Sequence, residues 1–229
     1  MGRILPASLA GLALLCLGAC ERREAAQSSI PPPSKLAADA SDTGVLAAAE
    51  PFQALARAAF TARRPLLDRD IARAIAIAQH VKPALPPDAQ RELSTQLDAI
   101  AAAQRIENRA GIAWAAVEIY RLFVSHAAPT IVPREVNLLR YASLRYEADL
   151  KARPVNWDDM VGAADFGQRT WAAIQGRVSD AALRQRISQA LVDLADAARR
   201  RDPALAVDAD RRALELTSLL EAHLAATGQ

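Results

Sequence analysis

Apolar residues recur at helical spacing along almost the whole chain from residue 43 onward, and this periodicity limits the fold more than any other feature. Phe52, Leu55, Ala56 and Ala59, for example, follow the i, i+3, i+4, i+7 spacing that places side chains on one face of a helix. Few stretches show the period-two alternation typical of strands. Hydrophobic residues make up 52% of the chain and aromatic residues only 4%, so the core must consist mainly of aliphatic side chains. The pattern predicts an all-α fold.

Prolines and capping residues divide this pattern into separate helices. Pro83 and Pro129 each follow the end of an apolar stripe, where proline stops a helix. Asn156, Ser179 and Asp202 precede the last three stripes and are suited to cap their N-termini. We therefore expect residues 43–229 to form a single helical bundle of about seven or eight helices.

Two parts of this helical region resemble each other. Residues 66–126 and 157–223 each contain three predicted helices, and AVEIYRLFVSH aligns with ALELTSLLEAH so that Glu118 and His126 match Glu215 and His223. A duplication predicts two pseudo-repeated three-helix units related by a pseudo-twofold axis, with residues 134–150 crossing between them. The matching apolar stripes of the two units would then face a shared core. Alanine-rich amphipathic helices also align by chance, so the sequence leaves both interpretations open.

The first residues are of a different kind. Arg3 is followed by an apolar run over residues 4–17, which is shorter than the roughly 20 residues needed to span a bilayer and fits a secretory signal. The run closes with Leu17-Gly18-Ala19-Cys20, which resembles the lipobox of bacterial lipoproteins. The resemblance covers these residues only. It implies that residues 1–19 are removed as a signal peptide and that Cys20 is acylated, for example with palmitate. An ordinary signal peptide with a chance cysteine is the alternative.

The resemblance also predicts where the protein resides. A lipidated Cys20 would hold the chain on the cell envelope, facing the periplasm, and residues 20–42 would serve as a flexible tether that contains Pro31-Pro32-Pro33. In well-studied lipoproteins an Asp after the cysteine retains the protein at the inner membrane. Glu21 stands there instead, which favours the outer membrane. Cys16 would be lost with the signal peptide, so no disulfide is expected in the mature chain.

No catalytic or cofactor motif is present in the sequence. The chain lacks HExxH, CxxCH and nucleophile-elbow patterns, and Asp158, Asp159 and Asp165 form no recognisable carboxylate pair. His126 and His223 are weak metal candidates, because only a site that joins the two repeats could bring them together. The simpler interpretation places both in the last turn of a helix, where an imidazole can meet free carbonyls. We predict no metal, no cofactor and no enzymatic activity.

Neither the charge balance nor the aromatic residues point to a particular ligand or partner. Without Arg3 the chain holds 27 Lys and Arg against 26 Asp and Glu, which argues against a nucleic-acid partner. We interpret the basic cluster Arg199–Arg201 as a solvated helix end and the aromatic residues, including Trp114, as core rather than as the lining of a ligand groove.

Two functions remain open on this basis. The first is a non-enzymatic envelope lipoprotein whose bundle is an interaction or scaffold module for another envelope protein. The alternative is a periplasmic accessory protein that binds a ligand or metal at a site between the two repeats.

Overall fold

The computed structural model describes residues 44–228, and within that span it contains eight α-helices of 12 to 25 residues and no strand. The predicted all-α class and the number of helices are confirmed. The predicted signal peptide, lipobox and tether, residues 1–42, all lie outside the described residues. The helices are α2 (Gly44–Ala47), α3 (Glu50–Thr61), α4 (Arg64–Val81), α5 (Pro87–Arg105), α6 (Arg109–His126), α7 (Arg134–Lys151), α8 (Trp157–Ile174), α9 (Ala181–Arg200) and α10 (Pro203–Thr227), with short 3-10 turns at Lys82–Ala84 and Gln175–Arg177. None of these helices is long and apolar enough to cross a membrane.

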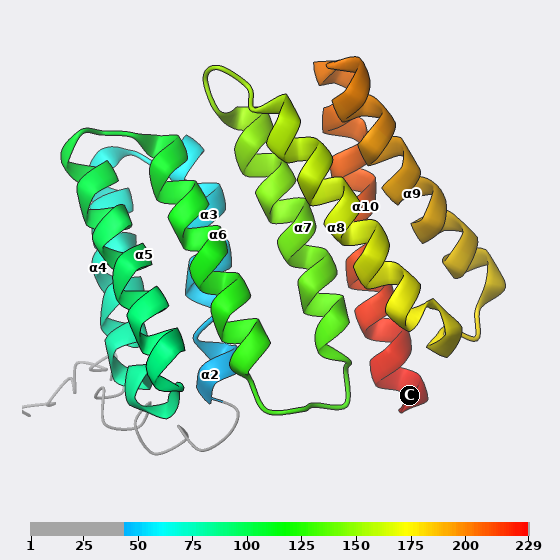
Figure 1. Ribbon diagram of the computed structural model, residues 1–229, viewed down its shortest axis with the longest axis horizontal. Helices are drawn as coiled ribbons and strands as arrows, with labels where there is room; N and C mark the ends of the chain where they lie inside the picture. The colour runs from blue at the N-terminus through cyan, green and yellow to red at the C-terminus, as the bar shows by residue number, and fades with distance from the viewer. Residues whose placement is uncertain (1–43, 229) are drawn as a thin grey trace, which may run out of the picture.

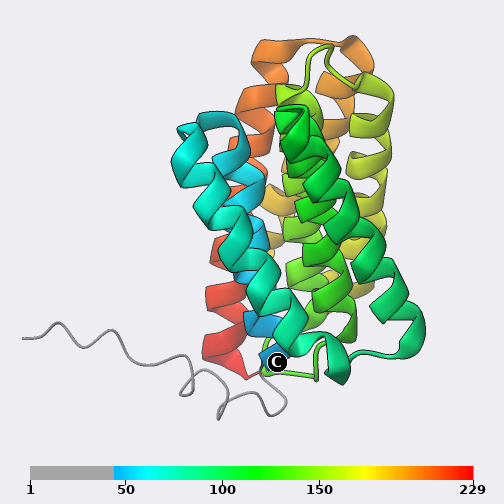
Figure 2. The same cartoon turned by 90° about the vertical axis from the view of Figure 1, so that its left-hand side faces the viewer.

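The eight long helices form two four-helix bundles that lie side by side (Figure 1). Successive helices run up and down, so that each packs antiparallel to the next. In the first bundle α6 packs back on α3, and in the second bundle α10 packs back on α7. The view from the side shows the same antiparallel course, with α4 and α5 nearest the viewer (Figure 2). Short connections and antiparallel neighbours are typical of up-down-up-down bundles.

Helix α7 joins the two bundles because it presents an apolar face to each of them. It packs against α8 and α10 of its own bundle and also against α6 and α3 of the other. Its side chains divide between the two cores, with Tyr141, Leu144 and Ala148 in the first and Leu139, Tyr146 and Leu150 in the second. The segment expected to cross between the repeats therefore does lie between them, as the first helix of the second bundle.

The predicted three-helix units are not the packing units of the structure. Each bundle has four helices rather than three, and α3 and α7 hold corresponding first places in the two bundles. The expected shared core is wrong, since Phe123 of α6 belongs to the first core and Leu220 of α10 to the second. The pseudo-twofold is also wrong. A twofold axis would exchange α3 with α7 and α6 with α10, so the packing of α6 against α7 would be matched by packing of α10 against α3. No comparable packing between α10 and α3 is present.

Two of the three predicted N-caps need correction. Asp180, not Ser179, caps α9, because its carboxylate accepts a hydrogen bond of 3.0 Å from the backbone N–H of Leu183. Asn156 does stand at the N-cap position of α8, but its side chain makes no capping hydrogen bond. Asp202 caps α10 as predicted, where it accepts hydrogen bonds of 2.9 and 3.1 Å from two backbone N–H groups of the first turn.

Candidate ligand-binding groove

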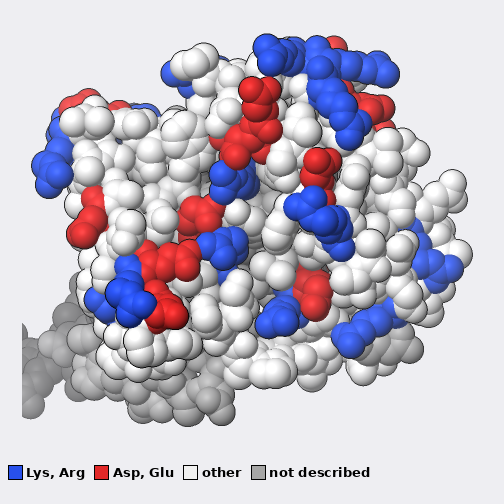
Figure 3. All heavy atoms as spheres, in the orientation of Figure 1, with Lys and Arg blue, Asp and Glu red and all other residues white. Residues whose placement is uncertain are grey.

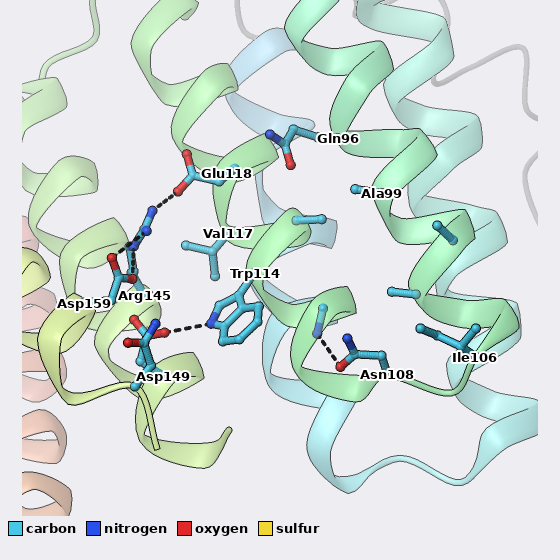
Figure 4. A pocket seen from close by; sticks show the side chains of 15 residues that line it. Gln96, Ala99, Ile106, Asn108, Trp114, Val117, Glu118, Arg145, Asp149 and Asp159 are labelled. Atoms are coloured by element: carbon cyan, nitrogen blue, oxygen red, sulfur yellow. Dashed lines mark hydrogen bonds and ion pairs between the residues drawn. The ribbon is translucent and has the colours of Figure 1, made fainter. Parts of the chain in front are cut away.

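A groove of about 570 Å³ separates the two bundles on one face of the molecule, between α5 and α6 on one side and α7 and α8 on the other (Figure 4). It lies toward the end of the bundles where α5 meets α6 and α7 meets α8, which is opposite the end where Gly44 begins α2 (Figure 1). The described residues that line it are Gln96, Ala99, Ala102, Ala103, Ile106, Asn108, Gly111, Trp114, Ala115, Val117, Glu118, Arg145, Asp149, Asn156 and Asp159. A volume of several hundred Å³ is the usual size of a small-molecule site.

The wall formed by α5 and α6 is mainly apolar. The short side chains of its alanines leave the groove open, and Trp114 borders the groove with 36% of its surface exposed. Asn108 caps α6 by accepting a hydrogen bond of 3.0 Å from the backbone N–H of Gly111. A Cβ at position 111 would lie 2.9 Å from Nδ2 of Asn108 and 3.0 Å from Cβ of Ala103, so glycine allows the cap and the close approach of α5 together.

The wall formed by α7 and α8 is charged, and Arg145 is at its centre. Arg145 holds Asp159 through two parallel hydrogen bonds, from Nε at 2.7 Å and from Nη2 at 2.9 Å. Its third nitrogen, Nη1, donates to Glu118 of α6 and, at 3.2 Å, to the hydroxyl of Tyr141. Such paired bonds between guanidinium and carboxylate are strong and fix orientation. Arg145 thus ties the second bundle to the first across the groove.

The same network continues into the first bundle. Glu118 also accepts a hydrogen bond of 2.9 Å from the hydroxyl of Tyr141 and one of 2.9 Å from Nε of Arg121, which in turn pairs with Glu92 of α5. Burial and the neighbouring Glu118 carboxylate raise the pKa of Tyr141 to about 12, so its hydroxyl keeps its proton for this bond. Four helices, α5 to α8, are linked by one chain of ion pairs and hydrogen bonds.

Asp149 lies on the floor of the groove and is fully buried. Its Oδ1 accepts a hydrogen bond of 2.8 Å from the indole Nε1 of Trp114, whereas its Oδ2 has no donor among the described residues. Figure 4 shows Asp149 beside Asp159, with Trp114 reaching it from the opposite wall. A buried carboxylate oxygen without a donor is costly unless the group carries a proton.

The pKa values of the two neighbouring carboxyl groups are shifted in opposite directions. Burial first, and then the neighbouring Asp159 carboxylate, raise the pKa of Asp149 to about 8. Burial acts on Asp159 in the same direction, but the hydrogen bonds from Arg145 and from Asp149 outweigh it and hold the pKa of Asp159 below its ordinary value. At neutral pH the pair therefore holds one proton, which Asp149 donates to Asp159.

This arrangement is suited to holding a ligand. Asp159 is held on both oxygens by Arg145, and the described residues that line the groove include no Ser, Thr, Cys, Lys or His that could act as a nucleophile. What the groove offers is an apolar wall with an aromatic ring facing a wall of fixed charges. Such a combination of apolar surface and a few convergent polar groups is typical of ligand sites.

The structure does not bring the two weak metal candidates to this groove. His126 is the exposed last residue of α6 in the first bundle, at the end remote from the groove. His223 lies in the second bundle, before the last turn of α10, with its Nε2 3.3 Å from the hydroxyl of Ser179. The last-turn interpretation is confirmed for His126 and wrong for His223. No three His, Cys, Asp or Glu side chains of residues 44–228 are grouped as metal ligands.

The basic cluster Arg199–Arg201 is a helix end, as predicted, and two of its side chains pair with acidic ones. Arg199 and Arg200 lie in the last turn of α9, and Arg201 takes the left-handed C-cap position with φ 54°. Arg199 pairs with Asp196 at 3.2 Å and Arg201 with Asp158 at 3.4 Å. Figure 3 shows this basic group at the upper right, and acidic and basic side chains interleaved over the rest of that face.

The prediction for the aromatic residues is confirmed for Tyr120, Tyr141, Tyr146 and Trp171, which are buried, and wrong for Trp114. The structure also shows site residues that the sequence interpretation missed, above all Arg145 and Asp149. A second buried carboxyl group, Asp210 of α10, lies outside the groove. Burial, followed by the neighbouring Glu147, raises its pKa well above the ordinary value.

Comparison with known proteins adds no family to this description: no family model matches the chain, and neither a curated protein nor a solved structure is significantly similar to it.

Proposed function

We propose that this chain is a lipid-anchored protein of the bacterial cell envelope whose helical domain binds a small ligand in the groove between its two bundles, without catalysing a reaction on it. This is the accessory ligand-binding role among the two functions that the sequence leaves open. The observation that carries it is the groove itself, with Trp114 on one wall and the buried Asp149 beneath the other. The groove lies between the two bundles, so a ligand site there exists only when both bundles are packed together.

The proposed anchor rests on Leu17-Gly18-Ala19-Cys20. Gly44, the first described residue, begins α2 at the end of the bundles opposite the groove (Figure 1), so an anchor N-terminal to Gly44 does not require the groove to face the membrane. Glu21 favours the outer membrane for that anchor.

Cys20→Ser is expected to abolish labelling with radioactive palmitate and to release the protein from the membrane fraction. The reason is that no helix of the described residues can cross a bilayer, so the lipid would be the attachment. Labelling and carbonate extraction of the full-length protein in a bacterial host measure both effects. Cys16→Ser, which changes only the discarded segment, is the control and keeps the label. A Cys20→Ser protein that still resists carbonate extraction would exclude the lipid anchor.

A tryptophan placed in the groove is expected to block ligand binding. Ala99 is an exposed alanine of α5 that lines the apolar wall (Figure 4), so Ala99→Trp fills the groove without entering either core. The ligands are three aromatic compounds of matched size, 2-phenylethylamine, 2-phenylethanol and 3-phenylpropanoate, and their binding is followed by ligand-detected NMR and calorimetry. We expect at least one of them to bind the full chain and to lose about tenfold or more in affinity in Ala99→Trp.

Ala173→Trp is the matched control, since Ala173 is an exposed alanine of α8 that does not line the groove. Binding should be unchanged in this variant. If none of the three compounds binds, or if both tryptophan variants weaken binding equally, the groove is not a ligand site and the proposal fails.

The scaffold role remains the second candidate because several large apolar side chains of the second bundle are exposed. Val192 of α9 and Leu205, Val207 and Leu219 of α10 are 45 to 55% exposed and lie outside the groove. Single exposed apolar residues are common on protein surfaces, so they support a partner less strongly than the groove supports a ligand.

A further inference from the structure

Among the residues that the structure describes, the groove has unused hydrogen-bond acceptors but no unused cationic donor. These lining residues include three carboxyl groups, those of Glu118, Asp149 and Asp159, and a single basic residue. That residue, Arg145, already donates from all three of its nitrogens, so it has little capacity to hold an anion. With Asp149 protonated, the lining carries one net negative charge, and with Asp149 ionised it carries two. Both values favour a positively charged occupant.

The carboxyl pair gives such an occupant a specific place. The side chain of Asp159 is 31% exposed and forms the accessible part of the pair, while Asp149 lies directly beneath it with Oδ2 lacking a donor among the described residues. A cation that approaches Asp159 therefore favours the ionised form of both carboxyl groups. Its electrostatic effect reaches Asp149 because little water screens charges at the buried floor of the groove. Asp149 is then the group that can respond, by giving up the proton that it shares.

The opposite wall suits the rest of the ligand. Trp114 presents a partly exposed indole to the groove, and Ala99, Ala102 and Val117 extend the apolar surface beside it. An indole face attracts an organic cation through its quadrupole. The indole N–H is already used by Asp149, so Trp114 offers its face rather than its donor.

We infer that the groove binds an organic ammonium or guanidinium cation with an apolar body, and that this cation takes the place of the proton shared by Asp149 and Asp159. The inference rests on the proposed function and names the class of ligand. The ammonium group lies against Asp159, the apolar body lies between Trp114 and the alanines of α5, and the proton leaves Asp149 for the solvent. One proton is released for each cation bound, so the total charge of the site is conserved.

The charged groups around Asp149 are consistent with this exchange on every side. Asp159 faces it from α8 and Arg145 from its own helix, while α6 contributes the neutral indole of Trp114 and, beyond Arg145, the carboxylate of Glu118. Arg145 stays paired in both states, and it limits the repulsion between the two carboxylates when Asp149 ionises. The pair can therefore hold either a proton or a cation without rebuilding the network.

The test uses the full chain in detergent with the same three compounds, of which 2-phenylethylamine is the cation, 2-phenylethanol the neutral match and 3-phenylpropanoate the anion. We expect the cation to bind at least tenfold more tightly than either match. Its affinity should rise by up to about tenfold per pH unit from pH 6 to pH 8 and level off above that, as one-proton linkage requires. Calorimetry in two buffers of different ionisation enthalpy should show close to one proton released at pH 6.

Two variants test the separate contributions of Asp149 and Asp159 to cation binding. Asp159→Asn should lower affinity for the cation by tenfold or more, and Asp149→Asn should remove the pH dependence. Asp158→Asn is the matched control, because Asp158 is the exposed neighbour of Asp159 and does not line the groove. Asp158→Asn should bind like the unmodified protein at every pH.

The outcomes distinguish this inference from the proposed function. If the neutral or anionic compound binds as well as the cation and Ala99→Trp blocks it, the groove is a ligand site and the cation inference is wrong. If the cation binds with an affinity that does not depend on pH, or binds Asp159→Asn unchanged, the proton exchange is wrong. If no compound of any charge binds, the inference and the proposed function both fail.

Discussion

Asp149→Asn is expected to raise the free energy of unfolding considerably more at pH 9 than at pH 5. An Asn at this position reproduces the protonated carboxyl group, since its Oδ1 can accept from Trp114 Nε1 and its amide can donate to Asp159. In the unmodified protein this donor is lost when Asp149 ionises, and a second carboxylate is then buried beside the first. The substitution removes that cost.

The sign follows from the raised pKa. Burial and Asp159 raise the pKa of Asp149 from 3.8 to about 8 in the folded chain, so the folded state binds more protons than the unfolded state between these values. Asp149 therefore stabilises the fold fully below about pH 4, and this contribution is lost as the pH rises through about 8. One pKa unit corresponds to about 1.4 kcal/mol, and about three pH units of this loss lie between pH 5 and about 8, so we expect the advantage of Asp149→Asn over the unmodified protein to grow by about 2–4 kcal/mol from pH 5 to pH 9.

Urea unfolding of both proteins between pH 5 and pH 9 measures this difference. Asp210 is also buried with a raised pKa, but it is present in both proteins, so its contribution cancels in the difference. Asp158→Asn, at an exposed position in the first turn of α8, is the control and should follow the unmodified protein at each pH. A difference between Asp149→Asn and the unmodified protein that is the same at pH 5 and pH 9 would mean that Asp149 does not carry the shared proton.

The helices could be predicted from the sequence because their signals are local. Apolar spacing defines which face of a helix is buried, and Pro83, Pro129 and Asp202 stand at the ends of helices in the structure as well. The cap of α9 was assigned one residue too early because Ser179 and Asp180 are both good capping residues. Only the position at which the chain enters the helix decides between them.

The arrangement into two bundles could not be predicted, because it depends on which helix each face meets. The sequence match covers α4 to α6 and α8 to α10, and it leaves out the first helix of each bundle. α3 has 12 residues and α7 has 18, and α7 packs against both bundles, so the two helices differ in length and in composition. A helix with two buried faces has little in common with one that has a single buried face.

The site was missed for a related reason, although one signal was present. Asp149 lies on the same helical face as Ala142 and Tyr146, and both belong to the apolar stripe of α7. A carboxyl group at a predicted core position is costly to bury alone, so it points to a partner or a shared proton. The sequence could not identify that partner, since Trp114 and Asp159 come from two other helices.

Phe123→Ala and Leu220→Ala test the two-bundle architecture, because these residues hold matching places in separate cores. Both side chains are fully buried, Phe123 in the first core and Leu220 in the second. Phe123 also makes an edge-on aromatic contact with Phe52, with ring centroids 5.7 Å apart. We expect Phe123→Ala to lower the free energy of unfolding by about 3–5 kcal/mol and Leu220→Ala by about 2–5 kcal/mol.

The double variant distinguishes two cores from one. Substitutions in separate cores with no common neighbour add to within about 0.5 kcal/mol, whereas residues packed in a shared core couple by about 0.5–3 kcal/mol. We therefore expect the costs of Phe123→Ala and Leu220→Ala to add in the double variant, as measured by urea unfolding. Leu219→Ala, next to Leu220 but 48% exposed, is the matched control and should have a much smaller effect. Coupling above 1 kcal/mol between Phe123 and Leu220 would instead indicate the shared core of a single bundle. The groove would then lie within one packed unit rather than between two.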